Sequence, residues 1–241
     1  MGLFNRKGTP EARTDESATP AAEESAEAGL DLSEAVTPGG PWDDSTAPAG
    51  IDEDPTYLDL GSLKIKGRPG FGLQLPQDDE SGTIGSVVLV TEESALELRA
   101  FASSRSGGLW DEVRADLLEE VGRLEGEADE VEGPFGTELR ARVPVELPDG
   151  EAGFQPSRIV GVEGPRWFLR ATFLGQEALE PSDDGLLMDA LRDVVVIRGD
   201  EPRPVREPLL IQVGEGIELV PADELEDEAP DATEQRPEGT A

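Results

Sequence analysis

The chain contains no cysteine and no histidine among its 241 residues. Without cysteine it can form no disulfide and offers no catalytic thiol, and without histidine it has no imidazole for a catalytic triad or a pH switch. Zinc sites built from the usual Cys and His ligands are excluded as well. The composition therefore excludes many common kinds of active site, and we expect neither a cofactor nor a metal centre.

Long apolar runs are also missing. No stretch approaches the roughly 18–20 apolar residues that a membrane-crossing helix needs, and the first residues contain no apolar segment typical of a secretion signal. These absences predict a soluble cytoplasmic protein without a membrane span.

Positive charge is scarce. The chain has 54 acidic and 20 basic residues, a formal net charge of −34, and residues 56–213 alone hold 31 acids against 16 bases. A field of this sign repels phosphate backbones, so direct binding to nucleic acid is not expected. The same field would favour a protein partner with a basic surface.

Apolar density divides the chain into three parts. Residues 1–54 and 214–241 are rich in acidic, small and proline residues, and such segments bury too little surface to offset the entropy lost on ordering. We predict that both are disordered acidic tails. Residues 55–213 hold enough apolar side chains for a core and are predicted to form a single domain.

One long helix is predicted near the centre of this domain. Its apolar residues recur at intervals of three and four, which places them on one stripe: Trp110, Val113, Leu117 and Val121. The opposite side is charged, with Glu112 as one example. A helix of this kind packs its stripe against a sheet, so the stripe residues are predicted to lie in the core.

Alternating or continuous apolar residues predict strands on both sides of the helix. These strands are expected at residues 57–65, 71–75, 84–90, 94–102, 137–145, 157–162, 167–174 and 194–197, with an edge strand at 209–213. A short helix is expected at residues 186–193. The strands at 157–162 and 167–174 should form an antiparallel hairpin, with Trp167 and Phe173 in the core.

The fold class that follows is α+β. We expect an antiparallel sheet of about five to eight strands, with the long helix packed on one face and the short helix near it. The order of elements is loosely similar to the topology of the Mog1 and PsbP group. Because unrelated functions share folds, this similarity of topology implies no function.

Arginines on strands form the main candidate site. Alternation places five of them on the polar side of their strands: Arg99, Arg140, Arg142, Arg166 and Arg170. If the strands are neighbours, the guanidinium groups would gather on the sheet face opposite the long helix and could bind carboxylates or phosphates. The alternative is a ladder of cross-strand ion pairs with acids such as Glu97 and Glu138.

Two acidic loops are a second candidate, because hard cations prefer carboxylate oxygens. One loop carries Asp78, Asp79 and Glu80, and the other carries Asp183 and Asp184. Neither has the spacing of a calcium-binding loop. Solvated turns explain these acids better than a cation site does, and we assign no metal ligand.

Several motifs together resemble a family of uncharacterised actinobacterial proteins, the domain of unknown function 3710 family. The similarity covers about residues 57–213 and is carried by Leu109–Arg114, Glu132–Gly136, Glu138–Pro144, Gly164–Arg170 and Arg198–Pro202. No catalytic or binding role attaches to these motifs, so the resemblance implies a domain and no activity.

Three functional hypotheses remain open. The first is a non-catalytic cytoplasmic interaction module that uses the arginine face. The second is an enzyme that acts on a small anion with arginines and carboxylates alone, and a deep pocket containing Arg99, Arg140 or Arg170 would favour it. The third is an acidic mimic of nucleic acid that occupies a basic protein.

Overall fold

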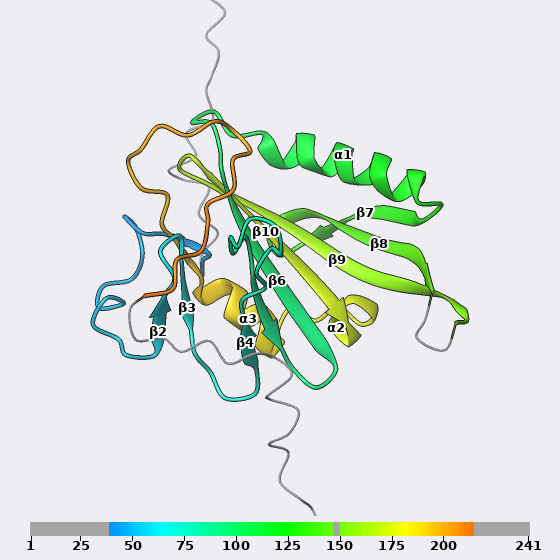
Figure 1. The fold of residues 1–241 in the computed structure, drawn as a ribbon, viewed down its shortest axis with the longest axis horizontal. Helices are drawn as coiled ribbons and strands as arrows, with labels where there is room; N and C mark the ends of the chain where they lie inside the picture. The colour runs from blue at the N-terminus through cyan, green and yellow to red at the C-terminus, as the bar shows by residue number, and fades with distance from the viewer. Residues whose placement is uncertain (1–38, 147–149, 215–241) are drawn as a thin grey trace, which may run out of the picture.

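A computed structural model describes residues 39–146 and 150–214. Its main element is a seven-stranded antiparallel sheet (Figure 1). The strand order is β4 (Gly72–Gln74), β5 (Val87–Val90), β6 (Ser94–Ala102), β10 (Trp167–Gly175), β9 (Ala152–Gly164), β8 (Gly136–Glu146) and β7 (Glu127–Gly133). The predicted α+β class and the predicted antiparallel hairpin, β9 with β10, are both confirmed.

A smaller four-stranded sheet was not predicted. Its order is β1 (Trp42–Asp43), β11 (Val195–Val196), β3 (Leu63–Lys66) and β2 (Tyr57–Asp59). Strand β1 pairs in parallel with β11, and the indole Nε1 of Trp167 donates a 2.7 Å hydrogen bond to Asp43 Oδ2. The folded part therefore begins before residue 55, and the boundary expected there is wrong. The predicted tails outside residues 39–214 lie outside the described part of the chain.

Helix α1 (Leu109–Arg123) lies across one face of the large sheet (Figure 1). A small core joins it to strands β8, β9 and β10 through Leu109, Trp110, Leu139, Ile159 and Phe168. Trp110 and Val121 are buried as predicted, and Val113 and Leu117 are partly buried. Burying such apolar side chains stabilises the contact by about 1.5–3 kcal/mol each.

The first turn of α1 is capped by a residue far away in the sequence. Gly108 precedes the helix in a left-handed conformation (φ 84°), which glycine adopts without strain. The backbone N–H groups of Gly108 and Leu109 donate hydrogen bonds of 3.1 and 2.8 Å to the carboxylate of Glu163 on β9. A carboxylate at this end also suits the positive end of the helix dipole.

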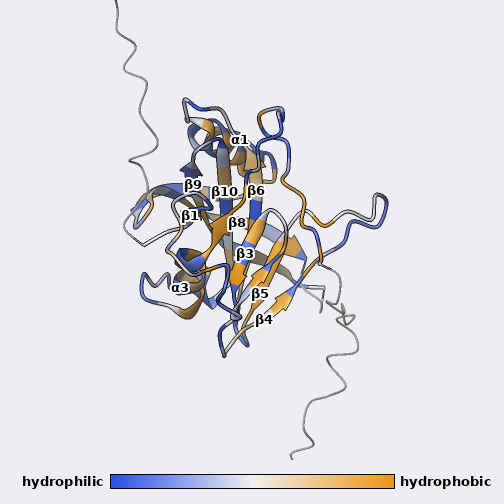
Figure 2. Cartoon of the chain, turned by 90° about the vertical axis from the view of Figure 1, so that its left-hand side faces the viewer, coloured by the Kyte–Doolittle hydropathy of each residue, from blue (hydrophilic) through white to orange (hydrophobic). Residues whose placement is uncertain are grey.

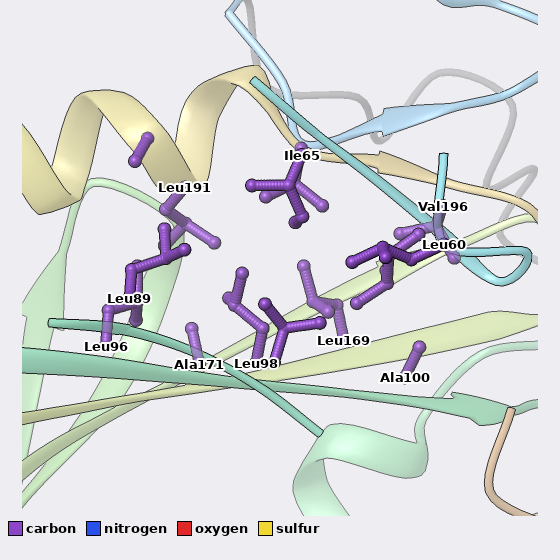
Figure 3. Packing of buried hydrophobic residues seen from close by; sticks show 14 of the residues in the cluster. Leu60, Ile65, Leu89, Leu96, Leu98, Ala100, Leu169, Ala171, Leu191 and Val196 are labelled. Carbon is purple, nitrogen blue, oxygen red and sulfur yellow. The ribbon is translucent and has the colours of Figure 1, made fainter. Parts of the chain in front are cut away.

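The larger core lies on the other face of the sheet. It contains Trp167 and Phe173, as predicted, and it joins β5, β6 and β10 to β3 and to helix α3 (Leu186–Asp193). Figure 3 shows Leu191 of α3 and Ile65 of β3 facing Leu98 and Leu169 of the sheet. Strand β5 is hydrophobic along its whole length (Figure 2). It lies between β4 and β6 in the sheet, and its Val87 and Leu89 belong to this core. The short helix α2 (Gln176–Leu179) follows β10.

The segment after β11 fastens the two sheets together. In this segment, the backbone N–H of Arg206 donates a hydrogen bond to the carbonyl of Ala102 on β6. The backbone N–H of Gln212 donates one to the carbonyl of Leu60 beside β3. Between them, Pro208 and Ile211 form only isolated bridges, so the edge strand predicted at residues 209–213 is not present as a regular strand. We call residues 206–212 the strap.

Candidate functional site

The strand register divides the five candidate arginines between the two faces of the sheet. Arg99 and Arg170 lie directly opposite each other on β6 and β10. They share a face with Phe101 and Phe168, the face that α1 covers in part. The expectation that arginines gather opposite the long helix is therefore wrong for this pair. Behind Arg99 and Arg170, the opposite face of β6 and β10 is filled by the larger apolar core.

Arg140 and Arg142 lie on the face away from α1. Arg140 is paired in register with Arg158, which the sequence analysis did not single out. Arg158 is buried and donates hydrogen bonds of 2.9–3.0 Å to the buried carboxylate of Glu138. Arg140 donates to the same carboxylate at 3.3 Å, and Arg142 pairs with Glu127 at 2.8 Å. On this face the alternative interpretation, a network of cross-strand ion pairs, describes what the structure shows.

Arg166 belongs to neither group. It occupies the tight turn between β9 and β10 with φ of 63°. Its guanidinium donates to the carbonyl of Gly199 at 3.2 Å and lies 3.8 Å from the carboxylate of Asp200. Arg166 therefore holds the loop after β11 and does not extend the surface around Arg170.

A groove of about 360 Å³ runs between α1 and the neighbouring strands β6 and β10. Its apolar lining consists of Phe101, Leu109, Val113, Leu117 and Phe168. Its charged lining consists of Asp116, Glu120 and Arg123 from α1, Arg170 from β10 and Arg206 from the strap. We call this the α1 groove. Its apolar walls with a few charged groups are typical of ligand sites, and its volume is at the small end of their range.

Most of the charges in the α1 groove already have partners. Arg206 joins the strap to α1 through Glu112 at 3.0 Å and Asp116 at 2.7 Å. Arg123 pairs with Glu120 on the same helix. These pairs are at least partly exposed to solvent, and such pairs contribute little to stability.

Arg170 is the exception. It is partly buried, its Nε is shielded from solvent without a hydrogen-bond partner, and nothing in residues 39–146 or 150–214 accepts a hydrogen bond from its guanidinium. Its Cζ lies 6.0 Å from the centre of the Phe101 ring. Burial, and secondarily the positive charge of Arg99, lower the pKa of Arg170 below its ordinary value, while Glu97 acts in the opposite direction.

Arg99, the arginine opposite Arg170, has an acidic partner of its own. Its Nε and Nη2 donate to Glu97 Oε1 at 2.9 and 2.7 Å. Among the arginines that the structure describes, all form an ion pair except Arg105, Arg170 and Arg198. Arg105 is exposed to water, and Arg198 donates to the carbonyls of Arg166 and Glu201. Arg170 alone of the three is shielded from solvent without a polar partner.

The sequence analysis missed the apolar half of this site. Phe101 follows Arg99 by two residues and Phe168 precedes Arg170 by two, so alternation alone places each phenylalanine beside its arginine. That signal was available in the sequence. Arg206 had no such signal, because its position on the groove depends on the path of the strap.

The acidic loops have other partners. Asp78 accepts hydrogen bonds from Ser81 within its own turn, and Asp183 pairs with Arg158 at 3.1 Å. In the described residues, no group of three or more acidic side chains is placed to hold a metal ion. The same part of the chain has no helix with the length and apolar character needed to cross a membrane.

Comparison with known proteins gives a family and no activity. No curated protein matches the chain. Residues 40–218, well over half of the sequence, match the family described as "Protein of unknown function (DUF3710)". The matched range includes strand β1, helix α1 and every residue of the α1 groove. The chain therefore belongs to the DUF3710 family.

Proposed function

We propose that this protein is a non-catalytic interaction module and that the α1 groove is its binding site. The observation that carries the proposal is Arg170, a partly buried arginine whose Nε is shielded from solvent and whose guanidinium has no hydrogen-bond partner in the described fold, in a chain of 54 acids. Burying a charge without a partner costs free energy. A group that costs stability in the free protein is expected where a ligand supplies the missing contact.

The register strengthens this reasoning. Arg170 on β10 lies directly opposite Arg99 on the adjacent strand β6, and like charges opposite each other destabilise a sheet. A purely structural role would be served better by an apolar residue at position 170, since Phe101 and Phe168 lie on the same face. The arginine is therefore better explained by recognition of an anionic group than by stability of the fold.

The partner we propose is a cytoplasmic protein with a basic surface, in an actinobacterial cell. The acid excess of residues 56–213 would attract such a surface over long distances and speed association. The groove would then take a local acidic and apolar element of that partner. Long-range attraction and local recognition thus involve charges of opposite sign on the partner.

Two measurements test the proposal. Arg170→Met should raise the free energy of unfolding by about 0.2–1 kcal/mol, because it removes a like-charge pair. Capture from a cell extract, quantified by mass spectrometry, should then yield a partner that is retained by wild type and by Arg105→Gln but lost by Arg170→Gln. Arg105 is the matched control because it is unpaired and exposed, outside the groove.

Two results would contradict the proposal. A large loss of stability in Arg170→Met would show that the arginine is structural. A purified partner that binds Arg170→Gln as tightly as wild type would place its binding site elsewhere on the protein.

A further inference from the structure

The chemistry of the α1 groove limits what can occupy it. Its only shielded cation without a polar partner in the described chain is Arg170, and two carboxylates, Asp116 and Glu120, also line the groove. A doubly charged phosphate would find only one guanidinium that is not already paired with an acid, because Arg123 and Arg206 are paired with Glu120 and Asp116. A single carboxylate matches the planar donor fork of one arginine and carries half the charge.

The apolar lining sets the second requirement. The Cζ of Arg170 lies over the Phe101 ring, 6.0 Å from its centre, and Phe168 stacks on Phe101 with ring centres 6.0 Å apart. A carboxylate held by Arg170 would therefore lie beside aromatic surface. A ligand that fills this volume must carry an apolar group next to its carboxylate.

The C-terminal residue of a polypeptide meets both requirements in one residue. Its free carboxylate and its side chain leave the same Cα, so an apolar last residue presents an anion and an apolar group only a few bonds apart. An internal acidic residue has a side chain that is itself the anion, and a separate residue must supply the apolar group.

We propose that the α1 groove binds the C-terminal carboxylate of a partner polypeptide that ends in an apolar residue, with Arg170 holding the carboxylate and Phe101 contacting the side chain. This inference rests on the proposed function, because it names the element of the partner that enters the same groove. Capture of a C-terminal carboxylate is an established mode of peptide recognition, and an arginine is suited to hold a carboxylate. The chain end belongs to the same partner whose basic surface the acidic domain attracts, so long-range attraction would bring the chain end close to the groove.

Short synthetic peptides test the inference directly. The probe is acetyl-Gly-Gly-Phe with a free carboxylate, and its matched control is the same peptide with a C-terminal amide. Binding is measured by calorimetry and by tryptophan fluorescence, since Trp110 stacks on Phe168 at the groove. The acid should bind about ten- to hundred-fold more tightly than the amide, the ratio expected for a charge-assisted hydrogen bond.

Protein variants assign the effect to the groove. Arg170→Gln should reduce affinity for the acid to that for the amide, whereas Arg105→Gln should leave both affinities unchanged. Arg170→Lys should restore only part of the affinity, because an ammonium group lacks the planar fork. The melting temperature of each variant shows whether any loss of binding comes from unfolding.

Several outcomes overturn the inference, and they separate it from the proposed function. Equal binding of acid and amide, or tighter binding of inorganic phosphate, would show that the groove does not recognise a chain-end carboxylate. Amidated acetyl-Gly-Phe-Glu carries its carboxylate on a side chain and has no free C-terminus. If it binds as tightly as acetyl-Gly-Gly-Phe or more tightly, the inference of chain-end recognition fails, but the groove remains a binding site that depends on Arg170. If no peptide binds while an Arg170-dependent partner is captured, the chain-end inference fails and the proposed function stands.

Discussion

The indole of Trp110 packs against the backbone of Gly161. A Cβ atom at position 161 would come within 2.2 Å of Cδ2 of the indole, closer than any side chain tolerates. The indole cannot easily withdraw, because its Nε1 donates a 2.8 Å hydrogen bond to the carbonyl of Thr137 and its ring stacks on Phe168. A glycine in the middle of β9 thus makes room for the largest side chain of α1.

This contact gives the first prediction. Gly161→Ala should lower the free energy of unfolding by about 1–3 kcal/mol through overpacking, and Trp110→Ala should lower it by about 3–5 kcal/mol through loss of packing. In the double variant the alanine at position 161 should add no further cost, because the clash has gone. Denaturant unfolding of all four proteins measures this coupling. Equal costs of Gly161→Ala in both backgrounds would contradict it.

The Trp110 stripe shows what the sequence could predict. Its period of 3.6 and the alternation of β6 and β10 are local patterns. The structure places β6 and β10 within one residue of the predicted positions, and α1 contains the whole predicted stripe. Strand β7 was missed because its sequence, EADEVEG, is mostly charged. It is an edge strand, and charge on an edge strand discourages pairing with other chains, which removes the apolar pattern of a buried strand.

The errors that affected the site have a different cause. Alternation is enough to place Arg170 and Phe168 on the same face, but no local pattern shows which face receives α1. That choice depends on contacts between distant segments, such as Trp110 with Gly161. Trp42–Asp43 was missed for the same reason, since a two-residue strand is defined by its pairing with β11 and by the hydrogen bond from Trp167.

The second prediction concerns the buried ion pair of Glu138 and Arg158. Both side chains are 1% exposed, so removal of Arg158 leaves the buried Glu138 carboxylate with the exposed Arg140, 3.3 Å away, as its remaining cationic partner. Arg158→Met should lower the free energy of unfolding by about 3–5 kcal/mol, whereas Glu138→Leu with Arg158→Met should cost much less. Arg140→Met is the control, because Arg140 is exposed and its pair with Glu138 should contribute at most about 1 kcal/mol. Similar stabilities of the single and double variants would contradict the prediction.

The third prediction concerns the cap of α1. Glu163→Ala removes the acceptor for Gly108 and Leu109 and should lower the free energy of unfolding by about 0.5–2 kcal/mol. Glu163→Gln keeps an acceptor oxygen and should retain part of this stability. Hydrogen exchange at the Leu109 amide should accelerate in Glu163→Ala and change less in Glu163→Gln. Unchanged protection in the alanine variant would show that the carboxylate does not cap the helix.

The fourth prediction concerns the pH dependence of the Asp78 turn. Hydrogen bonds from the backbone N–H and then the hydroxyl of Ser81, with a smaller one from the N–H of Glu80, lower the pKa of Asp78 below its ordinary 3.8. A depressed folded-state pKa contributes stability above the unfolded pKa, and this stability is lost as the pH falls through the folded value.

Wild type should therefore lose its advantage over Asp78→Asn as the pH falls below the ordinary carboxyl pKa of 3.8 and through the lower folded-state pKa, because the asparagine keeps an acceptor oxygen but does not titrate. Carbon NMR of the Asp78 carboxyl measures its pKa in the folded protein. Ser81→Ala should raise that pKa towards the ordinary value, since it removes the hydroxyl donor and keeps the backbone one. An Asp78 pKa at or above 3.8 in wild type, or no change in Ser81→Ala, would show that the turn does not stabilise the charged form.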